Sequence, residues 1–70
     1  MENKVKNLVL DGLRASATVV DEEGHERDIH TNGNGEGLWV NGRQVSGTCQ
    51  FSVNGMSKSG IYKKFRKVFT

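Results

Sequence analysis

The chain has 70 residues, a formal net charge of +2, and 34% apolar and 26% charged residues, which fits one small globular domain over residues 1–70 and excludes a disordered chain. Its longest apolar runs, such as Leu8 to Leu10, are too short for a membrane span of about 20 residues, and its single cysteine, Cys49, excludes an internal disulfide. We therefore expect a cytoplasmic protein without a membrane partner, small enough that oligomerisation or docking on a larger protein would help to stabilise it.

Four dipeptides are typical of tight chain reversals. Asp11-Gly12, Glu23-Gly24, Asn41-Gly42 and Asn54-Gly55 each separate stretches that carry Val, Leu, Thr or aromatic residues. Asn-Gly and Asp-Gly favour two-residue type I′ turns, because both central residues need a positive φ and glycine adopts it without steric cost. The spacing predicts a mainly β fold: an antiparallel meander of about five strands over residues 1–56, either open or curled into a small barrel.

The first predicted hairpin turns at Asp11-Gly12, which would pair Leu10 with Leu13. Successive strand residues point to opposite faces, so the inward face would consist of Leu8, Leu10, Leu13, Ala15, Ala17 and Val19. The opposite face is polar apart from Val5, Val9 and Val20. These valines give it more apolar area than a free surface needs.

The segment "DEEGHERD", residues 21–28, holds five acidic residues in and around the second turn. The sequence leaves open whether this acidic hairpin is only a solvated turn or also a docking site. His25 and His30 are five residues apart and would point to opposite faces of a strand, so we expect no metal site. Residues 31–37, "TNGNGEG", predict a flexible polar loop.

The turn at Asn41-Gly42 would pair Val40 with Arg43, and in the same register Val45, Gly47, Cys49, Phe51 and Val53 point inward. Trp39 then falls on a polar face beside Gln44 and Ser46. Two explanations for this tryptophan are open. Either it is exposed as the centre of an interface, or the C-terminal segment folds back and covers it.

The C-terminal segment, residues 57–70, is basic and amphipathic. As a helix it gathers Ile61, Phe65, Val68 and Phe69 into one stripe and leaves its lysines and arginine outside, with Ser57 or Ser59 as the N-cap. As a sixth strand it would mix lysines among the apolar residues, although its aromatic and β-branched residues favour a strand. The helix is slightly favoured.

The sequence gives no indication of catalysis. Cys49 is expected on the inward face, where a thiol is usually inert, and no nucleophile, phosphate-loop or dinucleotide motif is present. We therefore expect a protein that is not an enzyme and that has no cofactor and no small-molecule substrate.

A non-enzymatic binding protein is the remaining class, and nucleic acid is the first partner that we consider. Small β-proteins bind single strands with a basic surface and aromatic rings on which bases stack. The residues expected to contact nucleic acid are Trp39, Arg43, Lys58, Tyr62, Lys63, Lys64, Arg66 and Lys67.

The alternative is a protein-interaction module, either a homo-oligomer or a small regulator that docks on a larger protein. A short chain of this kind without an enzyme motif is typical of accessory and regulatory proteins of phages and bacteria. Its interface would consist of Val5, Val9, Val20, Trp39, Phe65 and Phe69.

Overall fold

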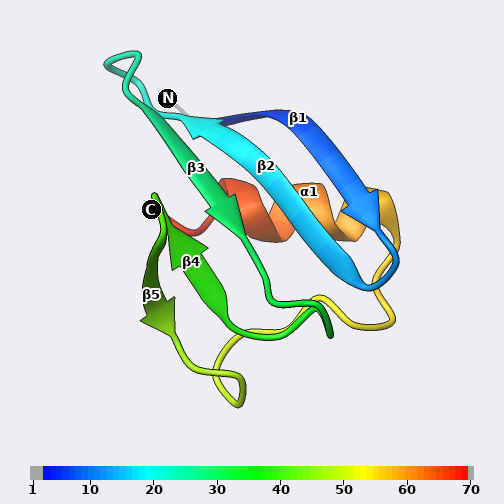
Figure 1. Cartoon of the computed structure of the whole chain (residues 1–70). Coiled ribbons are helices and arrows are strands. Elements are labelled where there is room, and N and C mark those ends of the chain that lie inside the picture. Colours follow the sequence, from blue (N-terminus) through cyan, green and yellow to red (C-terminus); the bar gives the residue numbers. More distant parts are fainter. Residues whose placement is uncertain (1–2, 70) are drawn as a thin grey trace.

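The computed structural model describes residues 3–69, which form five β-strands followed by one α-helix (Figure 1). The elements are β1 (Lys4–Asp11), β2 (Arg14–Val20), β3 (Glu26–His30), β4 (Leu38–Val40), β5 (Arg43–Ser46) and α1 (Lys58–Arg66). Each strand pairs antiparallel with the next, in the order β1-β2-β3-β4-β5. The predicted mainly β meander with a C-terminal helix is confirmed, and the sheet is open.

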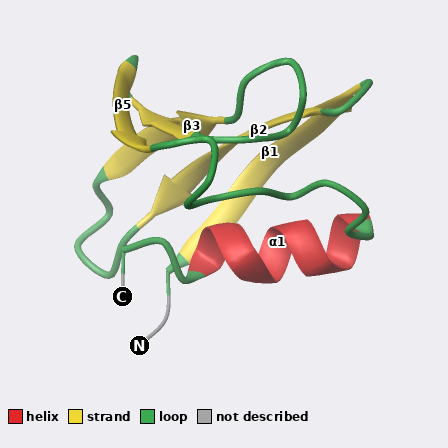
Figure 2. Cartoon of the chain, turned by 90° about the horizontal axis from the view of Figure 1, so that it is seen from below, coloured by secondary structure: helices red, strands yellow, loops and turns green. Residues whose placement is uncertain are grey.

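The helix covers one face of the sheet, beneath β1 and β2 (Figure 2). Phe65 of α1 is fully buried in this layer, together with Val19 and Ile29 of the sheet. The whole buried apolar core consists of Val5, Ala15, Ala17, Val19, Ile29, Leu38, Val53, Ile61 and Phe65. Among residues 3–69, no element covers the other face of the sheet, and no helix is long and apolar enough to cross a membrane.

The β1–β2 hairpin differs from its prediction in register. Its two-residue loop is Gly12-Leu13, and Gly12 has a φ of 62°, the pattern of a type II′ turn. Further along β1 the pairing shifts between Lys6 and Val9, where β1 holds one residue more than β2 and Asn7 has a φ of 56°. This is a β-bulge, which reverses the direction of the side chains that precede it.

The bulge and the position of the loop change which side chains of the first hairpin face the core. Val5, expected opposite the core, pairs with Val19 and is buried at 8% exposure. Leu10 and Leu13, expected inside, are 42% and 60% exposed, because Leu13 lies in the loop and Leu10 next to the end of the hairpin. The predicted inward residues of β2 (Ala15, Ala17 and Val19) are confirmed.

The β4–β5 turn is confirmed: Val40 pairs with Arg43, and Asn41 and Gly42 both have positive φ. A second irregularity follows, since Trp39 pairs with Gln44 but Leu38 pairs with Ser46. The extra residue, Val45, was expected inside and is 53% exposed.

The long inward strand predicted through residue 53 is wrong because β5 ends at Ser46. A turn follows in which Gln50 N–H donates to the Gly47 carbonyl, and the predicted inward Cys49 is exposed. The chain then crosses beneath the sheet, and Val53 N–H donates to the Gly35 carbonyl at 2.9 Å. Val53 is buried as expected.

Residues 31–37, expected to be a flexible loop, are held by hydrogen bonds. Thr31 is fully buried, and its Oγ1 accepts the Ala15 N–H at 3.1 Å. Asn32 Oδ1 accepts two backbone N–H groups of the same loop. Gly35 has a φ of 78° and packs so tightly that a Cβ there would come within 2.7 Å of the Leu13 carbonyl oxygen. The loop is thereby fixed against the tip of the first hairpin.

Within the C-terminal segment Lys58–Arg66 form a helix, which decides between the two alternatives. The Ser57 hydroxyl accepts the Gly60 N–H at 3.2 Å and caps the first turn. Ile61 and Phe65 are buried, and Val68 and Phe69 pack half-buried against the core. The predicted apolar stripe is therefore the one that docks on the sheet.

We expect Phe65→Ala to lower the free energy of unfolding by about 3–5 kcal/mol, because it opens a cavity at the centre of the helix–sheet layer. The measurement is chemical denaturation followed by circular dichroism. Lys63→Ala, on the exposed part of the same helix, should change the free energy of unfolding by less than about 0.5 kcal/mol. Equal losses in the two variants would contradict the packing described above.

Gly35→Ala and Gly12→Ala form a matched pair, since both positions have positive φ but only Gly35 is crowded. Gly12→Ala should lower the free energy of unfolding by about 1–2 kcal/mol, because alanine is strained in the left-handed conformation. Gly35→Ala adds a clash with the Leu13 carbonyl oxygen, so its free energy of unfolding should fall clearly further in the same denaturation experiment. If the two variants lose equal stability, the loop is not packed against the hairpin tip as described.

Candidate functional site

The surface of α1 that faces away from the sheet is basic. Between Ser57 and Phe69 the chain has five basic residues and no acidic residue. Lys58 and Lys63 are exposed, and Tyr62 is 36% exposed. Lys63 and Lys67 are four residues apart and therefore lie on the same side of the helix. We call Lys58, Tyr62, Lys63, Arg66 and Lys67 the α1 basic surface.

Two features keep this basic cluster compatible with a stable helix. Lys63, Lys64 and Arg66 lie in the last turn, where the negative end of the helix dipole favours cations. The end of the helix is also tied to the start of the chain, because Asn3 Nδ2 donates to the Arg66 carbonyl at 3.5 Å. The charges are thus placed on a well-anchored element.

Lys64 has a structural role that separates it from the other predicted binding residues. Its Nζ lies 4.7 Å from the centroid of the Phe51 ring and donates a hydrogen bond to the Ser52 carbonyl. Both partners belong to the segment that crosses beneath the sheet. Lys64 therefore fixes this segment to the helix, and its charge is less available to a ligand than that of Lys63.

Trp39 lies on the sheet face that the helix does not cover. It pairs with His30 and Gln44, and its ring stacks on the His30 ring with centroids 5.5 Å apart and planes 6° from parallel. Below it is Gly37, where a Cβ would come within 2.8 Å of Trp39 Cζ3. Trp39 is half-buried in this way by its neighbours in the sheet. The explanation in which the C-terminal segment folds back and covers Trp39 is therefore wrong, because α1 packs on the opposite face of the sheet.

Arg43 is exposed next to the β4–β5 turn. Together with Trp39 it belongs to the far part of the sheet, whereas α1 packs beneath β1 and β2. The eight residues expected to contact nucleic acid therefore divide into two groups. The sheet lies between the α1 basic surface and Trp39.

The uncovered face of the sheet also carries a shallow depression of about 270 Å³ over β2. Its polar lining mixes charges, with Arg14 on one side and Asp28 on the other, and Thr18 Oγ1 donates to Asp28 Oδ1 at 3.1 Å. Lys6 and Glu26 form an ion pair at 3.1 Å on the same face. A face that carries both signs of charge has a weaker field for polyanions than a face of one sign.

The residues of the alternative protein interface are also dispersed. Val5 and Phe65 are buried in the core, and Phe69 is half-buried with the Arg27 guanidinium 4.9 Å from its ring centroid. Val20 is half-buried, and Val9 is 55% exposed. The exposed apolar residues that sequence reasoning missed are Leu10, Leu13, Val45 and Met56.

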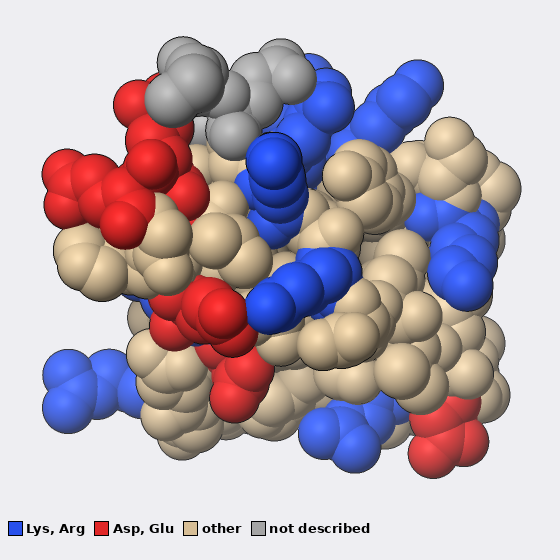
Figure 3. Space-filling view, turned by 90° about the horizontal axis from the view of Figure 1, so that it is seen from above, with Lys and Arg blue, Asp and Glu red and all other residues tan. Residues whose placement is uncertain are grey.

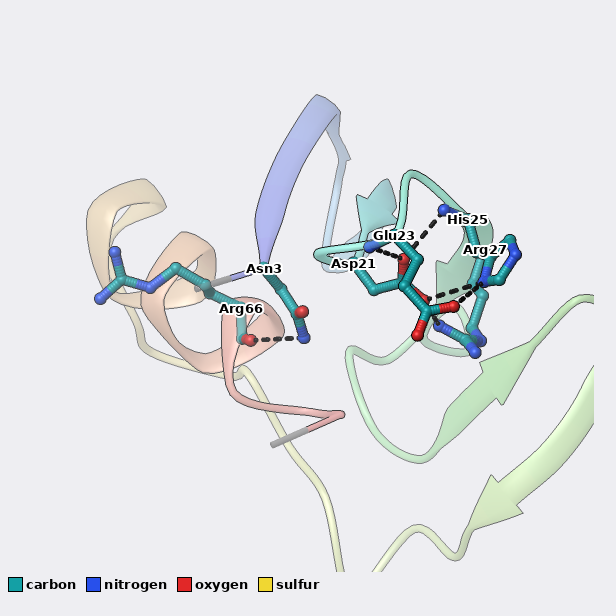
Figure 4. A network of polar contacts seen from close by, with 6 residues as sticks. All are labelled: Asn3, Asp21, Glu23, His25, Arg27 and Arg66. Carbon is teal, nitrogen blue, oxygen red and sulfur yellow. Dashed lines mark hydrogen bonds and ion pairs between the residues drawn. The ribbon is translucent and has the colours of Figure 1, made fainter. Parts of the chain in front are cut away.

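The acidic hairpin is organised by one carboxylate, that of Asp21 (Figure 4). Its Oδ1 accepts the N–H groups of Glu23 and His25, each at 2.9 Å, and its Oδ2 accepts from Arg27 at 3.1 Å. The His25 hydrogen bond, with help from Arg27, holds the pKa of Asp21 below its ordinary value although partial burial opposes the shift. Most acidic side chains in Figure 3 gather on one side of that view.

Among residues 3–69, no group of three or more His, Cys, Asp or Glu side chains is placed to hold a metal ion. Comparison with protein-family models, with curated proteins and with solved structures gives no significant match.

Asp21→Asn should destabilise the protein at neutral pH, because the ionised carboxylate is the form that accepts these bonds. The pKa of Asp21 is lower in the folded than in the unfolded chain, so its contribution is complete above the unfolded-state pKa and is lost as pH falls through the folded-state pKa. Denaturation of both proteins across the acidic range should therefore show their stabilities converging at low pH. A difference that stays constant with pH would show that the charge of Asp21 is not involved.

Proposed function

We propose that this protein binds nucleic acid through the α1 basic surface. The observation that carries the proposal is the helix itself, which presents basic side chains to solvent with no acidic residue from Ser57 to Phe69. The remainder of the chain supplies a stable platform on which that helix is docked.

The spacing of these charges suits a phosphate backbone. Lys63 and Lys67 are four residues apart and so about 6 Å apart along the helix axis, a separation comparable to that of neighbouring phosphates on one strand. Lysines that neutralise phosphates release condensed counterions, which makes binding favourable and salt-dependent. Tyr62 lies on the exposed part of the same helix and offers a ring on which an unpaired base can stack.

The geometry favours α1 alone over the larger set of residues expected from the sequence. Trp39 lies on the opposite face of the sheet, Arg43 lies at the β4–β5 turn away from β1 and β2, and Lys64 is engaged with Phe51 and Ser52. We therefore assign contact first to Lys58, Tyr62 and Lys63, which are exposed, with Arg66 and Lys67 next to them on the same surface. A ligand on the helix does not need to reach Trp39.

A protein partner is the second candidate, supported by the end of the β1–β2 hairpin, where Val9, Leu10 and Leu13 are each more than two-fifths exposed. Such an apolar tip is the kind of surface that contacts another protein. Binding there would depend little on ionic strength, whereas phosphate binding falls steeply as salt is added.

The test compares two variants that each lose two positive charges: Lys58→Ala/Lys63→Ala on the helix, and Arg14→Ala/Arg43→Ala on the sheet. Fluorescence anisotropy with labelled single- and double-stranded oligonucleotides should show the helix variant losing at least about tenfold in affinity at low salt. Its slope of log affinity against log salt should also flatten by about 1–2.

The sheet variant should stay close to wild type, because its arginines lie off the α1 basic surface. Equal losses in both variants would show a general effect of net charge and would contradict the assigned surface. If the wild-type protein binds no oligonucleotide even at low salt, the nucleic-acid function is wrong and the protein-partner candidate remains.

A further inference from the structure

The chain contains four Asn-Gly steps, at Asn32, Asn34, Asn41 and Asn54. In such a step the backbone nitrogen of the glycine can attack the Asn side-chain Cγ and expel ammonia, which closes a five-membered succinimide. Water then opens this ring to give aspartate or isoaspartate. The reaction needs an Asn amide that is free to rotate and a glycine N–H that is not held in a hydrogen bond.

In two of the four steps the Asn side chain is fixed. Asn32 Oδ1 accepts the N–H groups of Asn34 and Glu36, at 2.8 and 3.0 Å. Asn41 Oδ1 accepts the Asp28 N–H at 3.0 Å. Rotation of either amide toward the following nitrogen would break these bonds.

At Asn34 the attacking group is fixed instead. The Asn34 side chain is exposed, but the N–H of Gly35 donates to the Asn32 carbonyl at 3.1 Å. Gly35 is also buried against the first hairpin. The nitrogen therefore cannot move toward Asn34 unless the loop opens.

In the described part of the chain Asn54 has neither hydrogen-bond restraint, and its side-chain Oδ1 is held only by packing against Gly35, 2.6 Å from where a Cβ on that glycine would lie. Asn54 lies in an exposed turn closed by the Met56 N–H, which donates to the Val53 carbonyl at 3.2 Å. Within residues 3–69 no hydrogen bond involves the Asn54 side-chain amide or the Gly55 N–H. Gly55 has a φ of 74°, and no atom lies within 4 Å of the position that its Cβ would occupy.

We infer that Asn54 is a modification site, at which the folded protein deamidates spontaneously and faster than at its other Asn-Gly steps. The bond from Gly55 nitrogen to Asn54 Cγ forms as the Cγ–Nδ2 bond breaks, and the amide leaves as ammonia. Hydrolysis consumes one water and leaves a carboxylate, so the net charge falls by one. The new charge lies three residues before Ser57, the N-cap of α1.

Trypsin, which cleaves after Lys and Arg, makes the test direct. Peptide 44–58 contains Asn54 alone, and peptide 28–43 contains the other three sites. The folded full-length protein is incubated in mildly alkaline buffer, digested at intervals and examined by mass spectrometry. We expect the mass increase of an amide-to-carboxylate exchange first in peptide 44–58, which isoaspartyl methyltransferase should then label.

Two controls define the result. Asn54→Ser should abolish the early mass increase in peptide 44–58, which also contains Gln44 and Gln50. In denaturant, all four steps become free and peptide 28–43 should convert at least as fast as peptide 44–58. The inference is overturned if peptide 28–43 converts as fast as peptide 44–58 in the folded protein, or if Asn54→Ser leaves the early increase in place.

Discussion

The structure depends on the docking of α1 against one face of a five-stranded sheet. A sheet of this size has little core of its own, and a chain of 70 residues has few apolar side chains to spare. Ile61 and Phe65 close the layer from the helix side, while Ala15 and Ala17 of β2 are small enough to let the helix approach. The cap at Ser57 and the contacts of Lys64 with Phe51 and Ser52 hold this helix in place.

The sequence predicts the elements of this fold better than it predicts which way their residues point. Turn chemistry identified the β4–β5 hairpin correctly at Asn41-Gly42, and helical periodicity identified the stripe of Ile61, Phe65, Val68 and Phe69. Leu13 and Cys49 were misplaced because the first loop is Gly12-Leu13 and because β5 ends at Ser46, and the other errors come from the two bulges. Each inserts one residue into a ladder and reverses the alternation, which moved Val5 into the core and Val45 out of it. The alternation of apolar and polar residues along a strand does not reveal where such an extra residue will be inserted.

The candidate site shows the same limit. The sequence identified the basic residues of the helix, but it grouped them with Trp39 because both kinds of residue suit nucleic acid. Which sheet face the helix covers is decided by long-range packing, and α1 covers the face opposite Trp39. The stacking of Trp39 on His30 was missed for a related reason, since it depends on the pairing of β3 with β4 across a seven-residue loop.

The bulge in β1 also bears on how the protein behaves among copies of itself. β1 is one of the two outer strands, and the main-chain groups on an outer edge can recruit another chain into a continuous ladder. The bulge at Asn7 interrupts that edge in the middle, and Lys4 and Lys6 place charge beside the interruption. The opposite edge, β5, is only four residues long. Both edges are therefore poor templates for adding further strands, and the same irregularity that brings Val5 into the core interrupts the β1 edge.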